Sequence, residues 1–118
     1  MKPRHKIFVV SWKLYPFDVM VCLGAPPEAI IKWLNKTDQK PSESYKKHLI
    51  FSGSGKTLFL PKGGTIIWTR FFPAKGSGVL AHEIYHAVQF LMRKLKIGNE
   101  EAHAYAIEYL TNEVNKRL

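Results

Sequence analysis

The sequence is organised around the stretch Val79-Leu80-Ala81-His82-Glu83-Ile84-Tyr85-His86-Ala87-Val88. Apolar residues in and after this stretch recur at helical spacing, which predicts a helix from about Gly78 to Leu95 with Ser77 as its N-cap. Residues i and i+4 of a helix lie one turn apart on the same face. The imidazoles of His82 and His86 can therefore bind one metal ion, with Glu83 beside it.

The two histidines belong to the polar side of this predicted helix. At about 100° per residue, one aliphatic stripe is formed by Leu80, Ile84, Ala87, Val88, Leu91 and Leu95. His82 and His86 point nearly the opposite way, on the side that also carries Gln89 and Arg93. We therefore predict that the imidazoles face a cleft or solvent and bind a metal. The alternative is a pair of solvated surface histidines.

A catalytic zinc ion has three protein ligands and an open position for water. The motif His82-Glu83-x-x-His86 supplies two of them when it lies on a helix. A second helix is predicted after Gly98, with Asn99 as its N-cap and an antiparallel packing on the first helix. The candidates for the third ligand are Glu100, Glu101 and His103. Glu101 is preferred because small alanines beside it allow close helix approach, whereas His103 would give a three-histidine site.

The residues before the motif predict a small sheet and one short helix. The strand-like runs are Lys6–Leu14, Val19–Leu23, His48–Ser52, Thr57–Leu60 and Thr65–Phe72. A turn is expected at Tyr15–Asp18, a helix at Glu28–Lys36 after two prolines, and an exposed polar loop at Thr37–Lys47. Together these elements predict an α+β domain, in which a small mixed β-sheet packs against the motif helix and a C-terminal helix.

The segment Gly53-Ser54-Gly55-Lys56-Thr57 is similar to a nucleotide-binding P-loop but does not match it. The P-loop pattern has a glycine where this chain has Ile50, and it opens a helix whose N–H groups bind phosphate. The residues that follow here, Leu58–Pro61, are strand-like and end in a helix breaker. The segment is therefore predicted to be a Gly/Ser hairpin turn.

Composition indicates one globular domain over residues 1–118, with 46% hydrophobic residues. The single cysteine, Cys22, excludes an internal disulfide framework and favours a reducing compartment. No apolar run has the length of a membrane span and no signal peptide is recognised, so the expected location is cytoplasmic. The net charge is +9, but the lysines and arginines are scattered, and nucleic-acid binding is not expected.

The two motif segments resemble the gluzincin class of zinc metallopeptidases in a minimal form. The resemblance rests on His82-Glu83-Ile84-Tyr85-His86-Ala87-Val88 and Asn99-Glu100-Glu101-Ala102-His103-Ala104-Tyr105, and it covers residues 65–118. The second segment is also similar to small metallopeptidase-like proteins of bacteriophages and prophages. The resemblance implies a zincin-like fold in which His82, His86 and Glu101 bind Zn²⁺ and Glu83 is the general base. Thermolysin-like enzymes carry an Asp where this chain has Tyr105.

The expected activity is hydrolysis of a peptide or protein substrate. Zinc lowers the pKa of its bound water, and Glu83 would take a proton from this water and pass it to the leaving amine. Tyr105, Tyr85 and Arg93 are candidate donors to the developing oxyanion, and Tyr105 is preferred because it lies one turn from Glu101. The strand at Thr65–Arg70 is expected beside the cleft, where zincins pair an edge strand with the substrate.

Two other functions are consistent with the same motif. One is a zinc-binding module of this fold that acts by binding another protein, without turnover. The other is a basic nucleic-acid-binding domain with structural zinc, which lacks the four closed ligands of such sites. Glu83 favours the peptidase, because a purely structural zinc site has no use for a carboxylate beside the metal-bound water.

Overall fold

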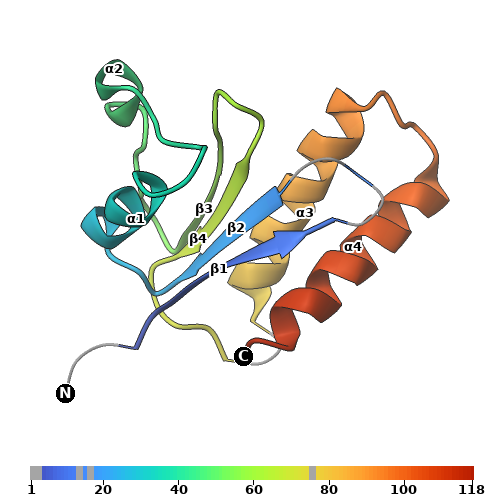
Figure 1. Ribbon diagram of the computed structural model, residues 1–118. Coiled ribbons are helices and arrows are strands. Elements are labelled where there is room, and N and C mark those ends of the chain that lie inside the picture. The colour runs from blue at the N-terminus through green and yellow to red at the C-terminus, as the bar shows by residue number, and fades with distance from the viewer. Residues whose placement is uncertain (1–3, 13–14, 16–17, 75–76) are drawn as a thin grey trace.

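A computed structural model describes residues 4–12, 15, 18–74 and 77–118 of the chain. Four strands form one mixed sheet, and two long C-terminal helices pack on one of its faces (Figure 1). The elements are β1 (Lys6–Ser11), β2 (Asp18–Leu23), α1 (Pro27–Leu34), α2 (Glu43–Lys46), β3 (Gly55–Phe59), β4 (Thr65–Thr69), α3 (Gly78–Lys94) and α4 (Glu100–Asn115). The predicted α+β class, with a mixed sheet against the motif helix and a C-terminal helix, is confirmed.

The strands lie in the order β1-β2-β4-β3, so β1 and β3 are the two edges of the sheet. β1 pairs with β2 and β3 pairs with β4 in antiparallel fashion, whereas β2 and β4 are parallel. All five residues of β4 are buried, as expected for a central strand covered on both faces. The turn predicted at Tyr15–Asp18 includes residues 16–17, which lie outside the described part of the chain.

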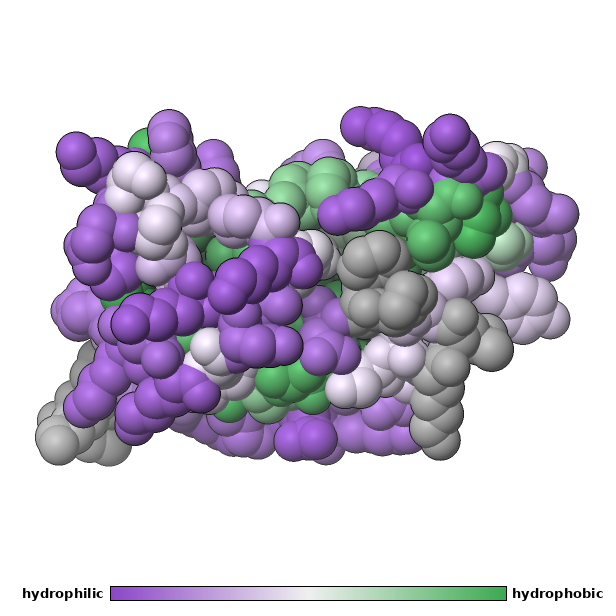
Figure 2. Space-filling model, turned by 45° about the horizontal axis from the view of Figure 1, so that its top comes forward, coloured by the Kyte–Doolittle hydropathy of each residue, from purple (hydrophilic) through white to green (hydrophobic). Residues whose placement is uncertain are grey.

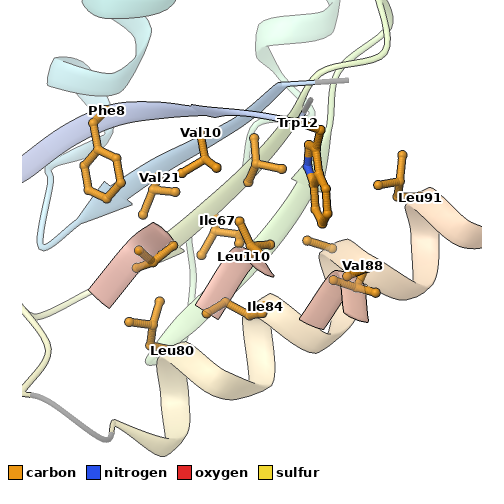
Figure 3. Close-up of a cluster of buried hydrophobic side chains, with 14 of the residues drawn as sticks. Phe8, Val10, Trp12, Val21, Ile67, Leu80, Ile84, Val88, Leu91 and Leu110 are labelled. Atoms are coloured by element: carbon orange, nitrogen blue, oxygen red, sulfur yellow. The ribbon is translucent and has the colours of Figure 1, made fainter. Parts of the chain in front are cut away.

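The main core lies between the sheet and the two C-terminal helices (Figure 3). The aliphatic stripe predicted for α3 is buried there, and only Leu95 at its end is partly exposed. These side chains meet Val21 and Ile67 from the sheet and Leu110 from α4. The hydroxyl of Tyr109 donates a hydrogen bond to the backbone oxygen of Ser11, 3.1 Å away, and so ties α4 to the end of β1.

A second core covers the other face of the sheet under α1. It joins Ile30 and Leu34 of α1 to Cys22, Ile66 and Trp68 of the sheet. Complete burial raises the pKa of the Cys22 thiol to about 12, since a thiolate would lose its hydration there. Cys22 therefore stays protonated and acts as a small apolar side chain.

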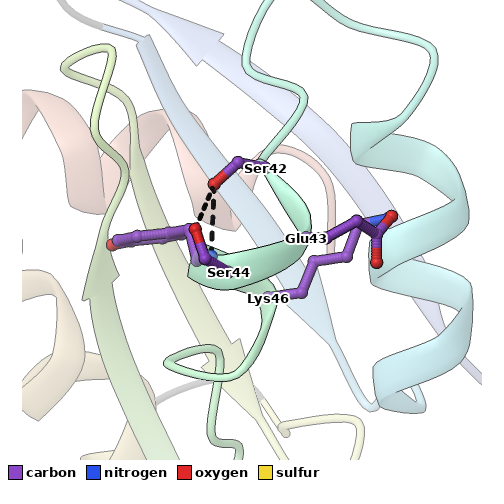
Figure 4. Close-up of polar contacts among 5 residues, drawn as sticks. Ser42, Glu43, Ser44 and Lys46 are labelled. Atoms are coloured by element: carbon purple, nitrogen blue, oxygen red, sulfur yellow. Dashed lines mark hydrogen bonds and ion pairs between the residues drawn. The ribbon is translucent and has the colours of Figure 1, made fainter.

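Two sequence predictions between α1 and β3 are wrong. His48–Ser52 is a loop and not a strand, because its apolar residues Leu49 and Phe51 point into the second core as single anchors. The polar run at Thr37–Lys47 contains the short helix α2. Ser42 caps α2 by accepting a hydrogen bond from the backbone N–H of Tyr45, and Glu43 pairs with Lys46 (Figure 4).

The surface of the molecule is mainly hydrophilic on the face seen in Figure 2, where apolar side chains form separate groups between charged ones. None of the helices in the described ranges is long and apolar enough to cross a membrane.

Candidate metal centre

Helix α3 carries the motif and begins where the sequence predicts. The hydroxyl oxygen of Ser77 accepts a hydrogen bond from the backbone N–H of Leu80, 3.2 Å away, so the predicted N-cap is confirmed. Helix α3 packs against both β3 and β4, while α4 covers its other side. The buried stripe therefore fixes how α3 is rotated, and this rotation turns the motif toward the β3 side of the sheet.

The imidazoles of His82 and His86 converge on the exposed side of α3. Their Nε2 atoms lie 3.0 Å apart, and their rings are nearly perpendicular, at 81°. Zinc lies about 2.0–2.1 Å from an imidazole nitrogen, so a tetrahedral ion holds two such nitrogens about 3.4 Å apart. The pair needs to open by only a few tenths of an ångström to hold one ion. Without a metal, the same distance suits a hydrogen bond between the rings.

The carboxylate of Glu83 lies on the inner side of the same helix turn. Glu83 as a whole residue is only 6% exposed. Its Oε1 atom accepts a hydrogen bond from the hydroxyl of Thr57 on β3, at 2.8 Å. Glu83 faces the sheet edge because the i+1 position of the motif points between the histidine face and the aliphatic stripe.

A groove of about 410 Å³ runs between β3 and α3 and contains these three motif side chains. Its other lining residues are Gly55, Lys56, Thr57, Phe59, Gln89, Phe90 and Arg93. The rings of Phe59 and Phe90 stack with centroids 3.6 Å apart and form an apolar wall. Gln89 and Arg93 share the groove with the histidines, as the helical spacing predicts.

The three candidates for a third ligand lie on α4, away from the histidine pair. Glu100 and Glu101 are exposed in the first turn, where Asn99 caps the helix as predicted. His103 is held by two hydrogen bonds, one to the backbone oxygen of Ile97 at 2.7 Å and one to the side-chain amide of Gln89 at 3.2 Å. Within the described ranges, no three His, Cys, Asp or Glu side chains are grouped closely enough to bind a metal.

The pairing of α3 with α4 explains why Glu101 is apart from the histidines. His103 lies beside Gln89, and the helices run antiparallel, so Glu101 lies alongside the part of α3 beyond Gln89. Counting three residues from His86 to Gln89 and two more from His103 to Glu101 gives an axial offset of about 7.5 Å at 1.5 Å per residue. The ligand role of Glu101 stays a prediction.

The candidate oxyanion donors divide into two groups. Tyr105 is 69% exposed on α4 and Tyr85 is also exposed, and neither lines the groove. Arg93 does line it, on the histidine side of α3. The catalytic role of Tyr105 therefore stays a prediction, and Arg93 is the candidate that shares a cavity with Glu83.

The strand beside the groove is β3, not the predicted strand at Thr65–Arg70. That segment forms β4, which lies between β2 and β3 and has no free edge. The segment similar to a P-loop does not close a hairpin either: residues 53–54 form a bend, and Gly55–Thr57 begin β3. The sequence predicted a strand at Thr57–Leu60, but it did not predict that Gly55 and Thr57 would lie in the groove beside Glu83.

Comparisons of the chain with protein-family models, curated proteins and solved structures gave no significant match.

Proposed function

We propose that this chain is a zincin-like, zinc-dependent metallopeptidase, in which His82 and His86 bind zinc and Glu83 is the general base. One observation carries the proposal: two converging imidazole nitrogens and a buried carboxylate from one helix turn face a groove beside a free sheet edge. Two nitrogen donors at this spacing suit zinc, and a carboxylate at this position suits proton transfer.

The chain's own residues divide the chemistry between them. A zinc ion held by His82 and His86 would supply a Lewis acid that polarises the scissile carbonyl and acidifies water. Glu83 accepts the proton of the attacking water and returns it to the leaving amine. Its Oε1 already accepts a hydrogen bond from the Thr57 hydroxyl, so we assign the proton transfer to Oε2. Arg93 provides positive charge in the same groove.

The free edge of β3 supports an extended peptide as the substrate. At the ends of the β3–β4 ladder, the N–H of Arg70 donates to the oxygen of Ser54 and the N–H of Leu60 donates to the oxygen of Gly64. Pairing alternates along an antiparallel ladder, so Gly55 and Thr57 turn their backbone groups away from β4. A peptide that adds to this edge as a further strand lies directly beside Glu83.

The second candidate function is a zinc-binding protein of the same fold that binds another protein without cleaving it. It is favoured by the lack of a third ligand close to the histidine pair in the described part of the chain. The same free edge and groove would then hold the partner's segment as an added strand.

Metal analysis tests the zinc site. Purified wild-type chain is expected to carry about one zinc ion, and both His82→Ala and His86→Ala should lose it while staying folded. His48→Ala is the matched control, because His48 is an exposed histidine outside the groove, and it should keep its zinc. A native wild-type chain that takes up no added zinc would refute the proposal.

A peptide-library digest then separates enzyme from binder. Zinc-loaded wild type should cleave peptides, and Glu83→Gln, which keeps the size of the side chain, should reduce cleavage by at least about a hundredfold. If folded, zinc-loaded wild type leaves every peptide intact, the binding function replaces the peptidase.

A further inference from the structure

Thr57 is the point at which the sheet edge contacts the proposed base. Its hydroxyl oxygen lies 2.8 Å from Oε1 of Glu83 and 3.0 Å from the backbone oxygen of the same residue. The two residues are 26 positions apart in the sequence, so the contact exists only because β3 packs against α3. Thr57 has one hydroxyl proton, and the bond to the charged carboxylate is the stronger of the two.

Gly55, two residues earlier on the same strand, restricts the other carboxylate oxygen. A Cβ atom at this position would lie 2.9 Å from Oε2 of Glu83, 3.1 Å from its Cγ and 2.8 Å from a methyl group of Val79. All three distances are shorter than ordinary van der Waals contact. A side chain at residue 55 would therefore push the carboxylate out of its place, and glycine allows the strand to pass this close.

We propose that Thr57 and Gly55 are positioning residues for Glu83: Thr57 holds Oε1 by its hydroxyl, and Gly55 leaves room for Oε2. The catalytic consequence rests on the proposed peptidase function, whereas the placement of the carboxylate does not. A carboxylate whose rotamer is fixed in advance is ready for proton transfer without reorganisation.

The same two residues also face the substrate. Their side-chain positions face α3, while their backbone N–H and C=O groups point to the free edge, because Ser54 and Leu60 at the ladder ends bond to the β4 side. A peptide strand added at this edge would hold the backbone of Thr57, and through its hydroxyl the orientation of Glu83. Substrate pairing and base orientation are thus coupled through one residue.

Kinetics of the zinc-loaded chain test the role of Thr57. Thr57→Val keeps the shape but removes the hydroxyl, and it should lower kcat by about tenfold to a hundredfold with KM within about twofold, because the base acts in the transition state. Thr57→Ser keeps a hydroxyl and should restore most of kcat. In the Glu83→Gln background, Thr57→Val should have no further effect. Thr111→Val on α4 is the control and should match wild type.

Crystal structures give a readout that does not need turnover. Wild type and Thr57→Ser should hold the Glu83 carboxylate in one conformer against β3, whereas Thr57→Val should release it. The double variant Gly55→Ala/Val79→Ala should also displace the Glu83 carboxylate. Val79→Ala removes the clash between the new Cβ atom and Val79, so the displacement is then due to the clash with Oε2 of Glu83. Zinc content should stay at the wild-type level in all of these variants.

The outcomes separate the two proposals. An unchanged kcat in Thr57→Val, or an unmoved Glu83 in its structure, overturns the positioning role. A loss of zinc in Thr57→Val overturns it too, because Thr57 would then act on the metal site as a whole. A wild type that cleaves nothing refutes the peptidase, and the structures alone then decide whether Thr57 and Gly55 position the carboxylate.

Discussion

One face of helix α3 packs in the main core, and the opposite face carries the candidate metal ligands. Truncating Ile84 tests whether these two faces act independently. Ile84 is 2% exposed in the main core and lies between Glu83 and Tyr85. Ile84→Ala removes three methyl or methylene groups, which costs about 2.4 kcal/mol at about 0.8 kcal/mol each. The cavity left behind raises the expected loss of unfolding free energy to about 3–4 kcal/mol, within the usual range for such changes.

Urea denaturation of the metal-free chain measures this loss, and a zinc titration measures the site. Ile84→Ala should unfold at lower urea with an unchanged slope, and its melting temperature should fall by about 10–15 °C. While folded, it should still bind zinc with wild-type stoichiometry. His82→Ala is the converse variant: it should lose zinc but keep the unfolding free energy of the metal-free wild type within about 0.5 kcal/mol, as expected for an exposed position.

Two results would contradict this reasoning. A loss below about 1 kcal/mol in Ile84→Ala would mean that the core relaxes around the missing groups, contrary to the close packing expected of interiors. A folded Ile84→Ala chain without zinc would mean that the apolar and polar faces of α3 are not independent.

Three further predictions concern single residues. If Glu101 is the third ligand, Glu101→Gln should weaken zinc affinity at least about tenfold in a competition assay with a chelator, whereas Glu100→Gln should not; equal effects would remove Glu101 from the site. Asn99→Ala should lower the unfolding free energy by about 0.5–2 kcal/mol, measured in urea, because Asn99 accepts hydrogen bonds from two backbone N–H groups of α4. Folding raises the pKa of Cys22 to about 12, so the thiol of the unfolded chain ionises at a lower pH than the thiol of the folded chain. The free energy of unfolding therefore keeps its full value below about pH 9 and falls above it by about 1.4 kcal/mol per pH unit. The urea midpoint should therefore fall less between pH 8 and pH 10 in Cys22→Ala than in wild type. An equal fall in both would contradict the effect of burial.

Local sequence signals predicted the two C-terminal helices well. Helix α3 follows from its aliphatic spacing and from Ser77, and α4 follows from Asn99 and the acidic residues after it. Each of these signals acts within one or two turns of the chain. For the same reason the sequence could place His82, Glu83 and His86 on one helix turn without any knowledge of the sheet.

Contacts between distant segments are what the local signals could not predict. The approach of β3 to Glu83 joins residues 26 positions apart, and no local pattern indicates which strand becomes the edge. The offset between α3 and α4 is set by contacts of His103 with Gln89 and Ile97, which the short loop alone does not determine. The buried Leu49 shows the same limit, because an apolar residue can anchor a loop as well as a strand.

The free edge of β3 is short, and this has a consequence for the behaviour of the chain in solution. At its far end the hydroxyl of Tyr45 donates a hydrogen bond to the backbone oxygen of Phe59, so that carbonyl is already occupied. The groups left open on this edge are the N–H and C=O of Gly55 and Thr57 and the N–H of Phe59. A short guest strand can pair there, and pairing between two copies of the chain at the β3 edge is limited to the same few groups. A bonded carbonyl at the end of β3 limits edge-to-edge pairing at this strand, and the net charge of +9 adds mutual repulsion between copies.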